Sequence, residues 1–326
     1  MRTPNREAKV PSDRSRRARR RLAPAVAAVA AAGLLLATAA PASAETDGAR
    51  LNFTGGAAAD LTVYRPATGT WYARNLDGSQ FITTFGASTD RPFPEDYDGD
   101  GVADAAIFRP GTSQWWIRSS QTGALNVFSF GLSTDIAFPG HWVGGDARAD
   151  IAVFRPSTGQ WWFRNTATGA VTTTTFGSST DTPEPGDYDG DDILDIAVQK
   201  PNGQNWWRSS DDSAVRVVNF GLGTDVNVNA DYDGDGVTDW AKVRTQSGSR
   251  VWYLLQSSDG FAVRTFGTSS DVVAPADYDG DGSTDIAIWR AGTGQFWVLG
   301  SSDGLSVTPW GQIGDALPLS SYITGG

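Results

Sequence analysis

Residues 85–120 read FGASTDRPFPEDYDGDGVADAAIFRPGTSQWWIRSS, and this stretch is one copy of a repeat that decides the fold. Each copy has Phe-Gly, then Ser-Thr-Asp or a variant, an acidic loop in most copies, an apolar run ending in a cation, a turn and two aromatic residues. Copies of the Phe-Gly recur every 44 to 46 residues, at Phe85, Phe130, Phe176, Phe220, Phe266 and, as Trp-Gly, at Trp310. A repeat of this length is typical of ring-shaped or stacked architectures.

The segments inside each copy have the pattern of short β-strands. Runs such as DIAIWR (residues 285–290) are apolar and rich in β-branched residues, and turn sequences such as PSTGQ bound them. No window after residue 44 shows a capped 3.6-residue period, so helices are not expected. Each copy holds about four strands, which predicts an all-β chain folded as a single β-propeller with one blade per copy.

Six copies predict six blades of four antiparallel strands. The first blade begins with LNFTGGAAADLTVYRP and lacks most of the strand that should precede its loop. The chain ends with GDALPLSSYITGG, which has the pattern of that missing strand. We therefore predict that residues from about Leu317 to Thr324 pair with the first blade and close the ring.

The N-terminal residues have the pattern of an export signal. Nine Lys and Arg precede Leu22, an alanine-rich apolar run comes next, and PASA at 41–44 offers a cleavage site. The sequence therefore predicts a cleaved signal peptide at 1–44, a propeller at 45–326, and secretion by the general or the twin-arginine route. No later stretch is long and apolar enough to span a bilayer.

Removal of this leader makes the chain strongly acidic. The whole chain has 26 Lys and Arg and 37 Asp and Glu; the leader takes 9 basic and 2 acidic residues, leaving a net charge of −18. Such a chain repels nucleic acid and anionic membranes and attracts cations. It contains no cysteine, so neither disulfides nor thiol chemistry contribute. We expect a monomer.

The acidic loop is nearly intact in four copies. They are DYDGDGVAD (96–104), DYDGDDILD (187–195), DYDGDGVTD (231–239) and DYDGDGSTD (277–285). Oxygen ligands at alternating positions can wrap one hard cation, and the glycines permit the sharp turn. Calcium suits such a cage better than magnesium, and soft metals would require histidine or cysteine. We expect about four structural calcium ions; the alternative is a set of metal-free Asx turns.

A calcium-binding helix-loop-helix is excluded by the residue at position 12 of each loop. That motif needs a bidentate glutamate there, where this chain has Ile107, Val198, Lys242 or Ile288. The loop therefore joins two strands, with side-chain ligands at positions 1, 3, 5 and 9 and a backbone carbonyl at position 7.

The combination of Phe-Gly, an acidic loop and an apolar strand resembles the FG-GAP repeat, also described as the VCBS-type repeat, of integrin-α-like β-propellers. The resemblance covers the chain after the leader. It implies calcium between the first two strands of a blade, on the face away from the ligand. The implied ligands are Asp96, Asp98, Asp100, Val102 and Asp104; Asp187, Asp189, Asp191, Ile193 and Asp195; Asp231, Asp233, Asp235, Val237 and Asp239; Asp277, Asp279, Asp281, Ser283 and Asp285.

Three departures from the family pattern concern the metal loops. Asp192 occupies the glycine position of the second acidic loop, so we expect weaker binding there. The sequence HWVGGDARAD (141–150) has lost the first three carboxylates, and GGAAAD (55–60) is likewise reduced, so we expect no calcium in either. We interpret His141, the only histidine, as a loop residue.

The candidate ligand-binding residues are aromatic and cationic. Aromatic pairs occur in every copy and pack between blades or stack on sugars. The cations that end the apolar strands either pair with the Ser-Thr-Asp aspartate or bind acidic ligands. The candidates are Arg65, Arg109, Arg155, Lys200, Arg244, Arg290, Trp71, Trp115, Trp161, Trp206, Trp252 and Trp297.

No catalytic constellation is evident from the sequence. The lone histidine has no repeated partner, and the metal loops account for most of the paired carboxylates. We therefore expect a secreted, calcium-stabilised binding module that is not an enzyme and that recognises extracellular glycans or a protein surface. The alternatives are a polysaccharide-active propeller hydrolase or lyase, and a purely structural or adhesive protein.

Overall fold

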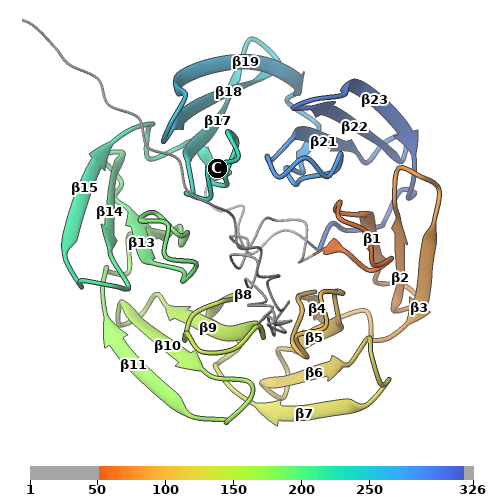
Figure 1. The fold of residues 1–326 in the computed structure, drawn as a ribbon, viewed down its shortest axis with the longest axis horizontal. Helices are drawn as coiled ribbons and strands as arrows, with labels where there is room; N and C mark the ends of the chain where they lie inside the picture. Colours follow the sequence, from red (N-terminus) through yellow and green to blue (C-terminus); the bar gives the residue numbers. More distant parts are fainter. Residues whose placement is uncertain (1–50, 319–326) are drawn as a thin grey trace, which may run out of the picture. The chain divides into compact units, whose positions relative to one another are not determined.

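The computed structural model describes residues 51–318, and these residues form a ring of six antiparallel β-sheets (Figure 1). Five sheets have four strands and the first has three. The six-bladed β-propeller expected from the repeat is confirmed. The predicted leader at 1–44 and residues 319–324 of the predicted closing strand lie outside the described part of the chain.

Each blade follows the chain from the centre of the ring outward (Figure 1). Blades 1 to 3 consist of β1 (Leu61–Arg65), β2 (Thr70–Arg74) and β3 (Gln80–Thr84); β4 (Arg91–Pro92), β5 (Ala105–Arg109), β6 (Gln114–Arg118) and β7 (Leu125–Ser129); and β8 (Ile136–Gly140), β9 (Asp150–Arg155), β10 (Gln160–Arg164) and β11 (Val171–Thr175). Blades 4 to 6 consist of β12 (Thr182–Pro183), β13 (Ile196–Gln199), β14 (Gln204–Arg208) and β15 (Val215–Asn219); β16 (Val226–Asn227), β17 (Trp240–Gln246), β18 (Ser249–Gln256) and β19 (Gly260–Thr268); and β20 (Val272–Val273), β21 (Ile286–Arg290), β22 (Gln295–Gly300) and β23 (Gly304–Pro309).

Burial decreases from the centre of the ring to its rim and explains the sequence of each strand. β5, in second place within its blade, is apolar and buried on both faces. β6 alternates between buried and half-buried residues, whereas the outermost β7 is largely exposed. The continuous apolar runs are therefore strands packed on both faces.

The hydrophobic core is divided among the blade interfaces. One cluster joins Tyr64 and Trp71 of blade 1 to Ile107 of blade 2, and another joins Phe154 of blade 3 to Val198 of blade 4. A blade cannot cover its own faces, so each depends on its neighbours for burial.

The ring closes where its two ends meet. Ala316 forms an antiparallel bridge with Tyr64 of β1, with two backbone hydrogen bonds of 2.8 Å. Asp315 also pairs with Arg65 at 2.7 Å. Pairing of the C-terminal segment with the first blade is confirmed; its backbone bridge lies one residue before Leu317, which is itself buried against blade 1. Within residues 51–318 no helix is long and apolar enough to span a membrane.

Candidate functional site

The four acidic loops connect the two innermost strands of blades 2, 4, 5 and 6. Just before each loop, a residue bridges to the ninth aspartate, as Glu95 does to Asp104 and Ala230 does to Asp239. Strands therefore flank the loops on both sides, and the exclusion of a helix-loop-helix is confirmed.

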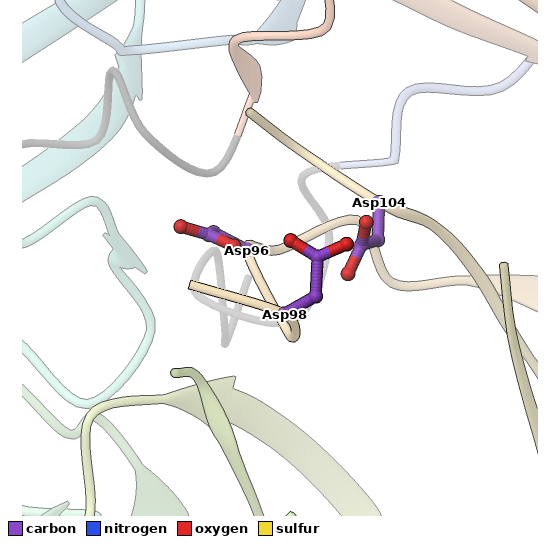
Figure 2. A group of neighbouring side chains, drawn as sticks. All are labelled: Asp96, Asp98 and Asp104. Atoms are coloured by element: carbon purple, nitrogen blue, oxygen red, sulfur yellow. The ribbon is translucent and has the colours of Figure 1, made fainter. Parts of the chain in front are cut away.

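Three carboxylates converge in each of these loops. Oxygens from positions 1, 3 and 9 lie within 4.8 Å of one another, as for Asp96, Asp98 and Asp104 (Figure 2). The equivalent groups are Asp187, Asp189 and Asp195; Asp231, Asp233 and Asp239; and Asp277, Asp279 and Asp285. The position 5 carboxylate is not part of these groups, so its role as a ligand, like that of the position 7 carbonyl, stays a prediction.

The aspartate at position 1 shapes the loop. The carboxylate of Asp96 accepts hydrogen bonds from the backbone N–H groups of Gly99, Asp100 and Gly101 at 2.6, 3.2 and 2.7 Å. Gly99 and Gly101 have φ of 81° and 83°, which glycine adopts without strain. The loop thus curls around its first carboxylate because of the two glycines.

The aspartate at position 9 joins the loop to the next turn of its blade. Asp104 accepts the Tyr97 N–H at 3.0 Å and the Ser120 N–H at 2.6 Å, one with each oxygen. Burial raises the pKa of Asp104 to about 7, despite these hydrogen bonds. Desolvation likewise raises the pKa of Asp195 and Asp239 to about 7 and that of Asp285 to about 6. A nearby cation would favour the charged form of these groups.

The aspartate at position 3 gives the strongest support for a cation site in these loops. In three loops its Oδ1 atom is buried and has no hydrogen-bond partner; these are the Oδ1 atoms of Asp98, Asp233 and Asp279. A buried, unpartnered oxygen on a carboxylate that lies close to two others is costly unless a cation binds. The donor set is entirely oxygen, which fits a hard cation such as calcium.

The loop in blade 4 differs from the other three. Asp192 holds a φ of 65°, where Gly101, Gly236 and Gly282 stand in the other loops. Its N–H still donates to Asp187 at 2.8 Å, so the loop keeps its path. The position 3 residue, Asp189, is exposed rather than half-buried. Both features agree with the expectation of a weaker site.

A pair of serines next to the loops was not identified from the sequence as part of the site. Ser119 donates to Asp98 at 2.5 Å, and the Ser120 hydroxyl contacts Asp100 at 3.1 Å. Ser301 and Ser302 donate to Asp281 and Asp279 at 2.7 and 3.0 Å. The available signal was Ser-Ser at 119–120, 209–210, 257–258 and 301–302, one pair for each intact loop, whereas the other two blades have Asn-Leu and Asn-Thr there.

The loop of blade 3 keeps its shape without the carboxylates. Asp150 accepts the Val143 N–H at 3.0 Å and the Thr166 N–H at 2.9 Å, as the ninth aspartates do elsewhere. Burial raises its pKa to about 6. Among residues 51–318, groups of three acidic ligands occur in the four intact loops and not in this loop or that of blade 1.

Neighbouring loops are connected by one backbone hydrogen bond per blade interface. The residue before the ninth position donates to the carbonyl of the first position in the preceding loop, as Thr238 does to Asp187 at 2.6 Å. The full set is Ala103 to Asn52, Ala149 to Asp96, Leu194 to His141, Thr238 to Asp187, Thr284 to Asp231 and Ala59 to Asp277. The six loops therefore form a closed hydrogen-bonded circle, which we call the loop ring.

The six cations that end the apolar strands are paired with the Ser-Thr-Asp aspartates. Arg155 contacts both oxygens of Asp135, at 3.0 and 2.8 Å. Its guanidinium also lies 5.0 Å from the centre of the Trp162 ring. The remaining pairs are Arg65–Asp315, Arg109–Asp90, Lys200–Asp181, Arg244–Asp225 and Arg290–Asp271. Of the two interpretations of these cations, ion pairing is confirmed.

Four of the predicted ligand-binding tryptophans are core residues, and that prediction was wrong. Trp71, Trp115, Trp161 and Trp252 are 0% exposed. Each indole N–H donates to the carbonyl of the Phe in the following Phe-Gly, as Trp71 does to Phe85 at 2.9 Å. Adjacent strand residues face opposite ways, and the first aromatic of the pair faces the buried side.

In five blades the second aromatic of the pair is the half-buried one, and in blade 4 it is the first. Trp206 and Trp297 belong to this group, together with Tyr72, Trp116, Trp162 and Tyr253. In blade 4 the pair is shifted by one residue, because Asn205 occupies the position of the buried tryptophan. Trp206 and Trp297 thus remain candidates, whereas in blades 1, 2, 3 and 5 the candidate is the next residue.

One groove adjoins these aromatic residues. A pocket of about 300 Å³ between blades 2 and 3 is lined by Ser129, Phe130, Gly131, Arg155, Trp162 and Val171. Arg155 ends β9, whereas the loop of blade 3 precedes its start. Five residue steps separate the ends of this strand, which is roughly 17 Å at 3.3 Å per residue. In blade 2, Ser129 pairs with Gln114, which pairs with Arg109, so this part of the groove lies at the end of the strands away from the acidic loop of blade 2. In blade 3 the groove extends further, because Val171 pairs with Arg164 opposite Ile151, at the loop end of the blade.

Comparisons with known proteins give distant structural similarities only. No protein-family model and no curated protein matches the chain. An Agrocybe aegerita lectin, whose structure concerns recognition of non-reducing terminal N-acetylglucosamine, is 17% identical, with a TM-score of 0.47, over 76% of this chain and 79% of that one. A streptogramin B lyase is 8% identical, with a TM-score of 0.46, over 77% and 80%. An oligogalacturonate lyase in complex with manganese is 14% identical, with a TM-score of 0.44, over 76% and 74%.

Proposed function

We propose that this chain is a secreted propeller of the FG-GAP or VCBS type, stabilised by calcium, and that it acts as a binding module for extracellular glycans. The observation that carries the binding role is the groove between blades 2 and 3. The half-buried indole of Trp162 provides an apolar surface beside polar groups of Arg155 and Ser129. Sugar recognition uses this combination of a flat apolar face and a few placed polar groups.

The charge of the groove favours a neutral sugar. Asp135 neutralises Arg155 through two hydrogen bonds, so its guanidinium offers little net attraction to an acidic ligand. The proposed role of calcium is structural, because the blade 2 residues of the groove lie at the end of the strands away from the acidic loop, and the loop of blade 3 has lost its first three carboxylates. In each loop the carboxylates at positions 1, 3 and 9 would hold the ion, which would neutralise their mutual repulsion.

A glycan array with the purified chain tests the proposal. We expect binding to one class of neutral glycan in the wild type and at least a tenfold loss in W162A. The matched control is W116A, which removes the equivalent ring between blades 1 and 2 and should bind like the wild type. Equal binding by W162A and wild type would reject the groove, and an array without any bound glycan would favour a structural or adhesive role. Turnover of a bound polysaccharide would instead favour an enzyme.

A further inference from the structure

The interface between blades 4 and 5 contains polar residues where the other interfaces are apolar. Blade 4 has Glu184, Gln199 and Asn205, and all three are at most 2% exposed. In blade 3 the same three positions of the repeat hold Phe138, Phe154 and Trp161. Three large apolar side chains are thus replaced by three smaller polar ones.

These three polar residues occupy neighbouring positions of the repeat, whose equivalents in blade 3 are in contact. The Glu184 N–H donates to Ala197 at 2.9 Å, as the Phe93 N–H does to Ala106 in blade 2, so the backbone is unchanged. Gln199 and Asn205 are direct partners across β13 and β14. The equivalent aromatic rings of blade 3 touch, since Phe138 and Phe154 lie 5.7 and 5.2 Å from Trp161 between ring centres.

Lys242 of blade 5 enters the same region from the neighbouring sheet. It stands where the other blades have valine or isoleucine, and its side chain is 0% exposed. Its Nζ lies 2.5 Å from Glu184 Oε2 and 2.7 Å from Asn227 Oδ1. The ion pair therefore uses one carboxylate oxygen of Glu184.

Three polar atoms of this cluster have no partner. They are Glu184 Oε1, Asn205 Oδ1 and Gln199 Nε2. The orientation of the Asn205 amide is fixed, because its Nδ2 donates to the Phe220 carbonyl at 2.8 Å, as the tryptophan indoles do in other blades. Buried groups of this kind destabilise the folded state when they stay unsatisfied.

We propose that this cluster is a built hydration site that holds one fixed water between blades 4 and 5. The water donates to Glu184 Oε1 and Asn205 Oδ1 and accepts from Gln199 Nε2, which uses its two protons and one lone pair. The smaller volume of asparagine relative to tryptophan provides the space. A metal cation is disfavoured there by the Lys242 ammonium and by the amide N–H of Gln199. This inference does not depend on the proposed calcium or glycan binding.

An atomic-resolution crystal structure of the full-length wild-type protein tests the proposal directly. We expect one density peak within about 2.7–3.2 Å of all three atoms. Direct pairing of the three atoms with one another, or the absence of a peak, would overturn the proposal. So would an anomalous signal at the peak after exchange of the buffer cations for rubidium, because it would identify a cation.

Oxygen-17 magnetic relaxation dispersion provides a second test in solution. N205W fills the space and restores an indole N–H toward Phe220, so we expect one fewer long-lived water than in the wild type. N219W changes an exposed asparagine on the neighbouring strand and should keep the wild-type number. Equal numbers in wild type and N205W would contradict the proposal, and the wild-type crystal structure decides alone if N205W does not fold.

Discussion

The ninth aspartate of each loop holds the backbone in place whether or not a metal binds. Asp239 accepts the Tyr232 N–H at 2.9 Å and the Ser257 N–H at 2.7 Å. Asp150 makes the equivalent contacts in a loop without the other carboxylates. Loop folding and metal binding can therefore be separated by substitution.

In chelator we expect D239N and D150N each to lower the free energy of unfolding by about 1–3 kcal/mol. The asparagine side chain has one oxygen and one NH2 group, so one of the two backbone N–H groups then faces a donor and loses its hydrogen bond. Calcium should stabilise the wild type and D150N equally, and D239N less. Urea unfolding with calcium or chelator measures both effects. A wild type that calcium does not stabilise would refute the metal assignment, and equal calcium stabilisation of all three proteins would exclude Asp239 as a ligand.

The buried aspartates also predict how the stability of the metal-free protein depends on pH. Desolvation raises the pKa of Asp104, Asp195 and Asp239 from 3.8 to about 7 in the folded state. The folded chain then binds more protons than the unfolded chain between about pH 4 and 7, so its stability falls as pH rises through this range.

In chelator we therefore expect a lower urea midpoint at pH 7.5 than at pH 5. In saturating calcium the trend should reverse, because the ion competes with these protons. A chelator-treated protein whose midpoint rises between pH 5 and 7.5 would contradict the raised pKa values. This pair of titrations needs no mutant.

The candidate metal ligands were predictable because their spacing within each loop is visible in the sequence. The four loops were recognised because acidic residues recur at fixed positions, and oxygens of Asp96, Asp98 and Asp104 do converge. The serines were missed because Ser120 approaches Asp104 from the next hairpin turn, a contact that the spacing within the loop cannot reveal.

The turn between the second and third strands of a blade contains a glycine that recurs together with the Phe-Gly motif, and the packing of the two explains why. Gly159, between β9 and β10, has a φ of 64°, and a Cβ there would lie 2.4 Å from the Gly177 carbonyl oxygen. Gly69, Gly203 and Gly294 make the same close approach to the Phe-Gly or Trp-Gly of their own blades. The turn glycine and the Phe-Gly therefore form one packing unit.

We expect G159A to lower the free energy of unfolding by about 2–4 kcal/mol, from the left-handed backbone and the clash with a carbonyl that cannot rotate away. The control is G123A, whose φ is 70° but whose Cβ would meet nothing within 4 Å. It should cost only about 1–2 kcal/mol. Equal losses in urea unfolding would show that the close approach is unimportant.

The choice of ligand-binding tryptophans was partly wrong because side chains alternate between the two faces of a strand. The aromatic pairs were identified, but the sequence did not show which member of each pair faces the neighbouring blade. In blade 4, Asn205 replaces the buried tryptophan, so the visible pair Trp206-Trp207 is displaced by one position, and a one-residue shift reverses the faces. The register of each strand against its neighbours decides which ring is buried, and spacing alone does not fix that register.

Closure of the ring depends on a small set of contacts between blade 1 and the residues that follow β23. Arg65 and Asp315 form the same ion pair as Arg155 and Asp135, but they join residues 250 positions apart. Asp315 also accepts the Gln312 N–H at 2.9 Å, as Asp135 accepts that of Leu132. Asp315 and Asp135 therefore make the same local contacts. The ion pair of Asp315 joins the two ends of the ring, whereas that of Asp135 lies within blade 3.

We expect D315A, but not D135A, to accelerate hydrogen exchange at the Tyr64 and Ala316 amides by about tenfold or more, since the ion pair across the closure is worth at least about 1.4 kcal/mol at a partly buried site. Mass spectrometry of the exchanged chain measures this. Similar exchange in both variants would mean that the other contacts of blades 1 and 6 suffice to hold the ring closed.

The number of blades and the place of closure were predictable because repeat count and missing strand are properties of the sequence. The polar interface between blades 4 and 5 was not predicted. Lys242 and Glu184 are 58 positions apart, and their contact exists only once blade 5 packs on blade 4. The pattern within one repeat predicts the strands of a blade, but it does not show which residues of neighbouring blades come into contact.

The loop ring has a consequence for how calcium would be taken up. Three intact loops, in blades 4, 5 and 6, are consecutive in the ring, whereas the loop of blade 2 has a reduced loop on each side. Thr238 and Thr284 link the ninth aspartate of one loop to the first aspartate of the loop before it. Ordering one of these loops should therefore lower the conformational entropy cost of filling the next.

We expect calcium titration to show positive cooperativity among blades 4 to 6 and independent binding in blade 2. D233N, in the middle loop, should weaken the two flanking sites, whereas D98N should leave all three unchanged, as followed by isothermal titration calorimetry. Equal effects of the two substitutions would mean that the loops fill separately. Cooperative binding would fill the loops of blades 4, 5 and 6 over a narrow range of calcium concentration. The loop of blade 2 would fill gradually over a wider range.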